Sequence, residues 1–88
     1  MLITAGQCRA ARAMLGWSQD DLAAQSTVAK PTIAGFESGR RQPYPRTLAD
    51  LRRALEAAGV TFLALGEASP TGGPGVRLDA VGGEPVED

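Results

Sequence analysis

Four basic residues have the clearest chemistry in this sequence: Lys30, Arg40, Arg41 and Arg46. Ammonium and guanidinium groups are common hydrogen-bond donors to phosphate oxygens. Alone, such charges would be an ordinary solvated surface. Three of them, however, lie in the stretch 17–43, where two short helical patterns meet at a tight turn, and the fourth follows it closely. A helix of this size can enter the major groove of B-DNA when a second helix holds it against the backbone. The stretch therefore favours phosphate contact and DNA binding.

Other kinds of chemistry find little support. The sequence has no histidine, which is the usual general base, and no cysteines spaced for zinc. Cys8 is alone, so it cannot form an internal disulfide, and its place on an apolar helix face favours a small buried hydrophobe. Asp20 and Asp21 are explained by the positive end of a helix dipole. We expect no enzyme, no cofactor and no metal site.

The charges divide the chain into two parts. Residues 1–66 carry eight Lys or Arg against five Asp or Glu, a net charge of +3, whereas 67–88 carry one Arg against five acids, a net charge of −4. We interpret 1–66 as one small DNA-binding domain and 67–88 as a Gly/Pro-rich, acidic C-terminal segment that is solvating or regulatory. With neither a signal peptide nor a membrane-spanning apolar stretch in view, the expected location is the cytoplasm.

Two capping boxes mark the first two helices. Thr4 and Gln7 have the spacing in which a hydroxyl accepts from one helix N–H while the third helical residue reaches back, and Ser18 with Asp21 repeats it. Gly16 ends the first helix, as glycine does where the chain turns left-handed. Trp17, beside the second cap, is expected to pack in the core rather than stack on a base.

The next two helices follow from hydrophobic spacing. The third is predicted over about 29–37, with Ile33 and Phe36 toward the core and Lys30, Pro31, Ala34 and Gly35 facing outward. The fourth begins near Pro45 or Arg46 and ends at Gly59. Its inner stripe is Leu48, Leu51 and Leu55.

Two strand-like runs come last. Residues 60–65 are rich in strand formers, and a second strand is predicted within 75–80 after a Gly/Pro/Ser/Thr loop. A hairpin between them follows if other elements cover it, because two strands alone are marginal. Residues 81–88 are predicted to be a disordered acidic end.

Several residues recur in the register of a known family. They are Arg12, Gly16, Ser18, Gln19, Leu22, Ala23, Val28, Thr32, Ile33, Phe36, Glu37, Gly39, Arg40, Arg41 and Pro43. Over roughly residues 3–65 the chain resembles the phage repressor/Cro type (XRE) helix-turn-helix family. The resemblance implies an all-α fold, a compact bundle of four to five helices with a helix-turn-helix. In this chain a short C-terminal β-hairpin or extended segment follows the bundle. The resemblance also implies a homodimer that binds palindromic operators in double-stranded DNA.

The resemblance also implies roles for single residues. By position, Gln19 would touch a phosphate and brace the start of the recognition helix, and Ser18 and Ser38 would lie at the DNA backbone. Arg40 and Arg41 would contact phosphates through main-chain N–H groups and side chains.

The resemblance also assigns positions in the recognition helix itself. Ala29 stands at the start of this helix. Lys30, Pro31, Thr32 and Gly35 occupy the positions that face base edges. Arg12 and Glu37 match a family pair that forms a buried or half-buried ion pair between the first and third helices, whereas Arg9 is expected to face solvent.

The sequence departs from the family at several positions, and the strand-like run 60–65 replaces the last helix of many members. The turn usually has glycine where Thr27 stands, which predicts a wider or strained turn. Ala29 replaces a Ser or Thr at the helix start. Gly35 has no side chain and Pro31 no hydrogen-bonding group, so base readout would depend on Lys30 and Thr32, with DNA shape contributing.

The leading interpretation is a sequence-specific transcription regulator, a repressor acting as a homodimer through residues 29–37. The alternative is an antitoxin or other protein-binding module. Its C-terminal segment would grip a partner protein, and its DNA binding would be autoregulatory. Tyr44 stays open between a loop-surface role and a place near the DNA backbone.

Overall fold

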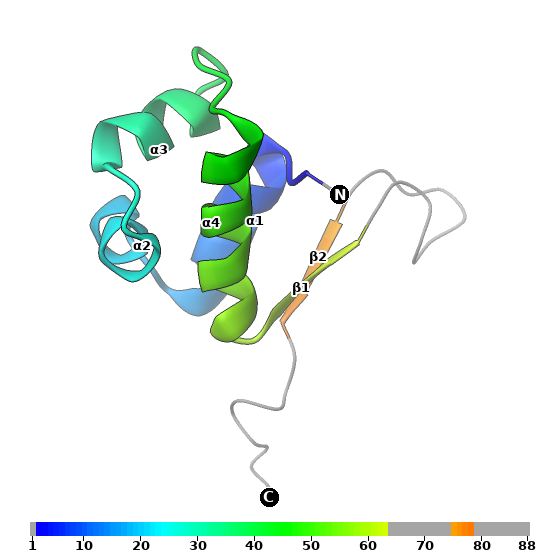
Figure 1. Cartoon of the computed structure of the whole chain (residues 1–88). Coiled ribbons are helices and arrows are strands. Elements are labelled where there is room, and N and C mark those ends of the chain that lie inside the picture. Colours follow the sequence, from blue (N-terminus) through cyan, green and yellow to red (C-terminus); the bar gives the residue numbers. More distant parts are fainter. Residues whose placement is uncertain (1, 64–74, 79–88) are drawn as a thin grey trace, which may run out of the picture.

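Four helices and a hairpin make up the part of the chain that the computed structural model describes, residues 2–63 and 75–78. Their bounds are α1 (Ala5–Leu15), α2 (Gln19–Ser26), α3 (Lys30–Glu37), α4 (Pro45–Ala57), β1 (Val60–Leu63) and β2 (Gly75–Leu78). Figure 1 shows α1 and α4 between the α2–α3 pair and the hairpin, and the helices of each pair are in contact. The predicted helical bundle with a C-terminal hairpin is confirmed.

The predicted helix starts are confirmed by their hydrogen bonds. The main-chain N–H of Gln7 donates to Thr4 Oγ1 at 3.1 Å, and that of Thr4 donates to Gln7 Oε1 at 2.9 Å. Ser18 and Asp21 exchange the same two bonds at the start of α2. Gly16 follows α1 with φ of 71°, in the left-handed region that glycine adopts without steric cost.

One hydrophobic core holds the helices together. Its largest fully buried aliphatic side chains come from three helices and include the predicted inner stripe of α4: Leu22, Ile33, Leu48, Leu51 and Leu55. Burying each such side chain contributes about 1.5–3 kcal/mol. Trp17 packs against this core while half-exposed, as the sequence predicts. The core fixes one face of α3 and leaves the opposite face for other contacts.

The hairpin is antiparallel and depends on α1 and α4 for cover. Val60 pairs with Leu78 and Phe62 with Val76, and both β1 members of these pairs are buried. The buried Gln7 side chain donates from Nε2 to the carbonyls of Leu63 (3.0 Å) and Gly75 (2.8 Å). One α1 residue therefore ties both strands to the helices.

Several predicted segments lie outside the residues that the structure describes. The ends of both predicted strands, the Gly/Pro-rich loop and the acidic end fall within 64–74 and 79–88, outside the described residues. Among the helices that are described, none is long and apolar enough to cross a membrane.

Candidate nucleic-acid interface

A three-residue turn sets α3 across the end of α2. Thr27 has φ of 60° and ψ of 20°, so a β-branched residue occupies the left-handed region. The next residue, Val28, is buried, and its N–H donates to Ser26 Oγ at 3.1 Å. The Ser26 hydroxyl in turn donates to the Leu22 carbonyl. The turn is therefore strained at Thr27, one of the two outcomes that the sequence predicts there.

The first turn of α3 is its exposed end. Ala29, Lys30 and Pro31 are exposed, whereas Ile33 and Phe36 are buried. The Ala29 side chain provides no cap hydrogen bond, so N–H groups of the first turn lack a side-chain acceptor. Thr32 is half-buried at the edge of this surface. The helix thus presents its positive end and its first side chains outward.

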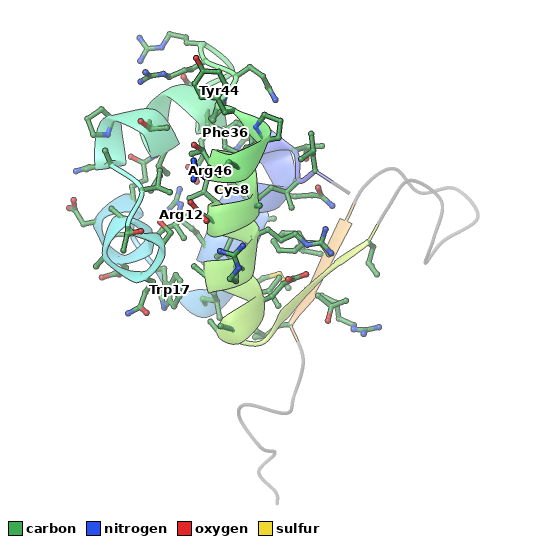
Figure 2. The ribbon with its side chains drawn as sticks, viewed as in Figure 1. Cys8, Arg12, Trp17, Phe36, Tyr44 and Arg46 are labelled. Atoms are coloured by element: carbon green, nitrogen blue, oxygen red, sulfur yellow. The ribbon has the colours of Figure 1, made fainter. Side chains whose placement is uncertain are left out.

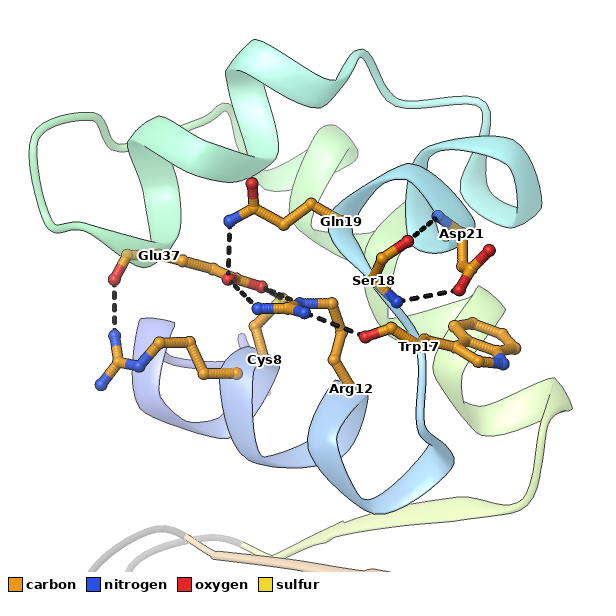
Figure 3. A network of polar contacts seen from close by, with 8 residues as sticks. Cys8, Arg12, Trp17, Ser18, Gln19, Asp21 and Glu37 are labelled. Carbon is orange, nitrogen blue, oxygen red and sulfur yellow. Dashed lines mark hydrogen bonds and ion pairs between the residues drawn. The ribbon is translucent and has the colours of Figure 1, made fainter.

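The other end of α3 is clamped by Glu37 (Figure 3). Arg12 of α1 donates from Nε to Glu37 Oε2 at 2.8 Å and from Nη2 to Oε1 at 2.7 Å. Cys8 Sγ donates to the same carboxylate at 3.1 Å, and the Arg9 guanidinium donates to the Glu37 carbonyl. The ion pair expected between the first and third helices is confirmed, and Glu37 is only 4% exposed.

Burial and hydrogen bonding compete at this carboxylate. Burial alone would raise the pKa of Glu37, but hydrogen bonds from Arg12, Gln19 and Cys8 outweigh it and hold that pKa below its ordinary value. The hydrogen bond to Glu37 raises the pKa of Arg12. Burial, followed by the bond to Glu37, raises the pKa of the Cys8 thiol. The pair is therefore charged at neutral pH, and Cys8 is a protonated donor.

Gln19 lies at this clamp, which corrects one expectation. Its Nε2 donates to Glu37 Oε1 at 3.1 Å. The side chain therefore braces the C-terminal end of α3 and not the start of that helix. The cause is the direction of packing: the N-terminus of α2 lies beside the last turn of α3 (Figure 3). The predicted phosphate contact of the half-buried Gln19 stays a prediction.

The basic loop after α3 corrects a second expectation. The main-chain N–H groups of Arg40 and Arg41 donate to the Gly35 carbonyl at 3.0 and 3.1 Å. Ser38 Oγ donates to the same oxygen at 3.1 Å. These two N–H groups end the helix and are not available to phosphates. The side chains of Arg40 and Arg41 are exposed and stay available for such contacts.

Gly35 corrects a third expectation, namely that position 35 is an open part of the outer face of α3. Four residues after Pro31, it shares the outer face of α3, yet it is buried rather than open. The cover is the Arg41 side chain: a Cβ built on Gly35 would lie 2.7 Å from its Cδ and 3.1 Å from its Cβ. The missing side chain at position 35 leaves space that the arginine fills.

The basic side chains differ in their partners. Lys30 Nζ lies 3.3 Å from Asp20 Oδ2, and both side chains are exposed. Arg40 Nε donates to Ser38 Oγ at 3.3 Å. To the residues that the structure describes, the side chains of Arg41 and Arg46 make no hydrogen bond or ion pair. Unneutralised positive charge thus gathers after α3.

Figure 2 labels side chains from both the interior and the surface of the protein. Cys8 and Phe36 are buried, as predicted, and Arg12 reaches from α1 to Glu37 on α3. Tyr44 is 82% exposed beside the basic loop, a position that fits both a loop-surface role and a place near the DNA backbone. Arg46 is exposed at the start of α4. Within residues 2–63 and 75–78, no three His, Cys, Asp or Glu side chains are grouped to hold a metal ion.

Two side-chain contacts of α1 were not predicted from the sequence. Arg9 is exposed as predicted, but it also caps the end of α3, and Gln7 joins α1 to the hairpin. Arg9 and Arg12 stand three residues apart on one helix face, so a shared target was a signal that spacing offered. Nothing in the sequence points from Gln7 to the hairpin.

The comparison with known families agrees with this geometry. A family model described as helix-turn-helix matches residues 9–61, more than half of the chain. The matched stretch begins at Arg9 and includes α2, the turn, α3 and α4. No curated protein matches the chain. With a braced two-helix unit, an outward helix start and a basic rim already in place, this match shows that the chain belongs to the XRE-type helix-turn-helix family of DNA-binding transcription regulators.

Proposed function

We propose that this regulator is a repressor that acts as a homodimer on palindromic operators. Each protomer places the first turn of α3 in a major groove, with the two half-sites about 34 Å apart, one turn of DNA. Occupation of a promoter then blocks transcription. The DNA-binding unit is residues 1–66.

One observation supports the proposed placement of α3 in the groove: α3 is anchored on one side and open at its start. Ile33 and Phe36 are buried and Glu37 is clamped, so the helix cannot turn on its axis. Lys30 and Pro31 stand exposed at its first turn. A rigid helix with an exposed, positively polarised end is the arrangement that groove binding and nearby phosphates require.

Side chains of the surrounding surface would hold the DNA backbone. Arg40 and Arg46 are exposed and lack carboxylate partners in the described part of the chain. Arg41 shares both properties, which suit a contact to a phosphate or to a base. Ser18 and Ser38 are exposed hydroxyls at the ends of α2 and α3. Lys30 and Thr32 are the polar side chains of α3 that can reach base edges, with Ala29 beside them.

A DNA-binding titration across salt concentrations tests the proposal. Genomic upstream fragments serve as the duplex, and the slope of log affinity against log salt should be about −0.9 for each phosphate neutralised. Affinity that does not change with salt would contradict it.

Matched variants sharpen that titration. Arg40→Ala removes a positive charge at the proposed surface and should weaken binding and reduce the slope by about 1. Arg53→Ala is the control: it removes the same charge from an exposed side chain on α4 that pairs with Asp50 at 2.9 Å. Equal losses from both variants would indicate nonspecific charge attraction and not a defined interface.

The homodimer and repression need their own measurements. Sedimentation with and without operator DNA should give two protomers per site. Shifting one half-site by five base pairs, about half a turn, should abolish high-affinity binding. A reporter under the bound promoter should rise when the gene is removed; a fall would indicate an activator.

A further inference from the structure

We propose that Arg41 reads a base, in place of the side chain that position 35 lacks, and predict that the base is guanine. The proposal depends on the proposed placement of α3 in the major groove. It assigns a specificity role to a residue outside the recognition helix, where the resemblance implies a contact to phosphate.

The path of the side chain is the first support. Gly35 and Pro31 are four residues apart on the face of α3 turned away from Ile33 and Phe36. The Arg41 methylenes lie against Gly35, where a built Cβ would meet Cδ at 2.7 Å and Cγ at 3.4 Å. The arginine therefore folds back against the outer face of the helix at Gly35.

The backbone beneath Arg41 is fixed. Its N–H donates to the Gly35 carbonyl at 3.1 Å, and the same oxygen accepts from Arg40 N–H and Ser38 Oγ. Three donors on one carbonyl hold the start of the loop against the last turn of α3. The Arg41 side chain therefore starts from a fixed backbone position next to Gly35, the residue that it covers.

The guanidinium itself is uncommitted. It makes no hydrogen bond or ion pair to the residues described, although five other arginines do: Arg9, Arg12, Arg40, Arg52 and Arg53. Arg41 lines one cleft with Thr32, Pro43 and Tyr44, and a second with Phe36 and Gly39. The side chain thus lines both clefts, and its donors have no partner among the residues that the structure describes.

The chemistry of this face favours arginine as the reader. Pro31 and Gly35 offer no side-chain hydrogen bond, so at these two positions the Arg41 guanidinium is the group that can donate to a base. Arginine donating two hydrogen bonds to O6 and N7 of guanine is the commonest specific contact in the major groove. A phosphate contact would instead position the protein without carrying sequence information.

Selection from a random duplex library distinguishes these roles. The wild-type chain should select guanine at one position of each half-site. Arg41→Ala should lose roughly 5- to 150-fold of the preference for that base, as one bidentate pair provides. Preferences elsewhere in the site should be kept. Uniform weakening across sequences, with a salt slope smaller by about 1, would mean a phosphate contact and overturn the proposal. Arg40→Ala is the control expected to behave in that uniform way.

Gly35→Ala tests the path over the helix. Alanine favours a helix more than glycine does, so the fold should persist, as circular dichroism and thermal unfolding would show. The new methyl displaces the flexible Arg41 side chain and should remove the same guanine preference. If Gly35→Ala keeps that preference, Arg41 does not act from this position. If the wild-type chain shows no salt-dependent binding to any duplex, the proposed function fails as well; failure of the variants alone leaves it standing.

Discussion

Arg12 and Glu37 join α1 to the last turn of α3 through two parallel hydrogen bonds, with N–O distances of 2.7 and 2.8 Å. The Glu37 carboxylate is almost fully buried, and it also accepts from Gln19 and Cys8. Three donor residues from α1 and α2 thus meet one carboxylate on α3. This contact fixes how far α3 stands out from the bundle.

Glu37→Ala should lower the free energy of unfolding by about 3–5 kcal/mol, because it leaves the Arg12 guanidinium without its buried partner. Chemical denaturation with a two-state fit measures the change. The control is Glu56→Ala, which breaks a pair with Arg52 at the surface of α4. Exposed pairs contribute about 0–1 kcal/mol, so equal effects from the two variants would mean that burial of Glu37 adds nothing.

The same carboxylate should make stability depend on acid pH. The folded pKa of Glu37 is lowered from an ordinary value of 4.5, so its contribution is fully present above that pH. It is then lost as the pH falls through the folded pKa. Stability measured from pH 7 downward should therefore fall more steeply in the wild type than in Glu37→Gln. Parallel curves would contradict this assignment.

Thr27→Gly should raise stability by about 0.5–1 kcal/mol. A β-branched residue at φ of 60° carries a steric cost of about 1–2 kcal/mol that glycine avoids, partly offset by the greater freedom of glycine in the unfolded chain. Gly16→Ala, at φ of 71°, is the reciprocal change and should lower stability. A thermal unfolding scan of both variants tests the pair, and a loss in Thr27→Gly would show that its hydroxyl matters more than strain.

The features that the sequence predicted correctly are local or periodic. The capping boxes at Thr4 and Ser18 depend on residues three apart, and the buried stripe of α4 repeats with the helix. The bond between Arg12 and Glu37 is the exception, because the two residues are far apart in sequence; the family register predicted it, and spacing did not.

The corrected features depend on side-chain paths in space. Position on the helix wheel places Gly35 outward, but it cannot show that an arginine six residues later folds back over it. It likewise cannot show that Gly35's carbonyl takes the N–H groups of Arg40 and Arg41, or which end of α3 Gln19 meets.

Asp20→Asn should strengthen DNA binding by about fivefold at low salt. Asp20 is the acid nearest to Lys30, 3.3 Å away, and its exposed carboxylate opposes approaching phosphates. One charge pair near 4 Å in water corresponds to about 1 kcal/mol. Glu56→Gln on α4 removes an equal charge as a control. An unchanged affinity in Asp20→Asn would remove Lys30 and its surroundings from the interface.

Ala29 offers a way to separate the stability of α3 from its place on DNA. It has the extended N-cap backbone, with φ of −63° and ψ of 140°, but no side chain that can cap. Ala29→Ser and Ala29→Asp should each stabilise the fold by about 1 kcal/mol, or roughly 4–8 °C in Tm for a domain of this size. Their DNA affinities should diverge, because serine adds a neutral donor while aspartate sets a negative charge where the groove and its phosphates would lie. Titration of both variants against the same operator at low salt measures the difference. If Ala29→Asp gains stability and binds as tightly as Ala29→Ser, the first turn of α3 does not face DNA, since no carboxylate at that point could escape the repulsion.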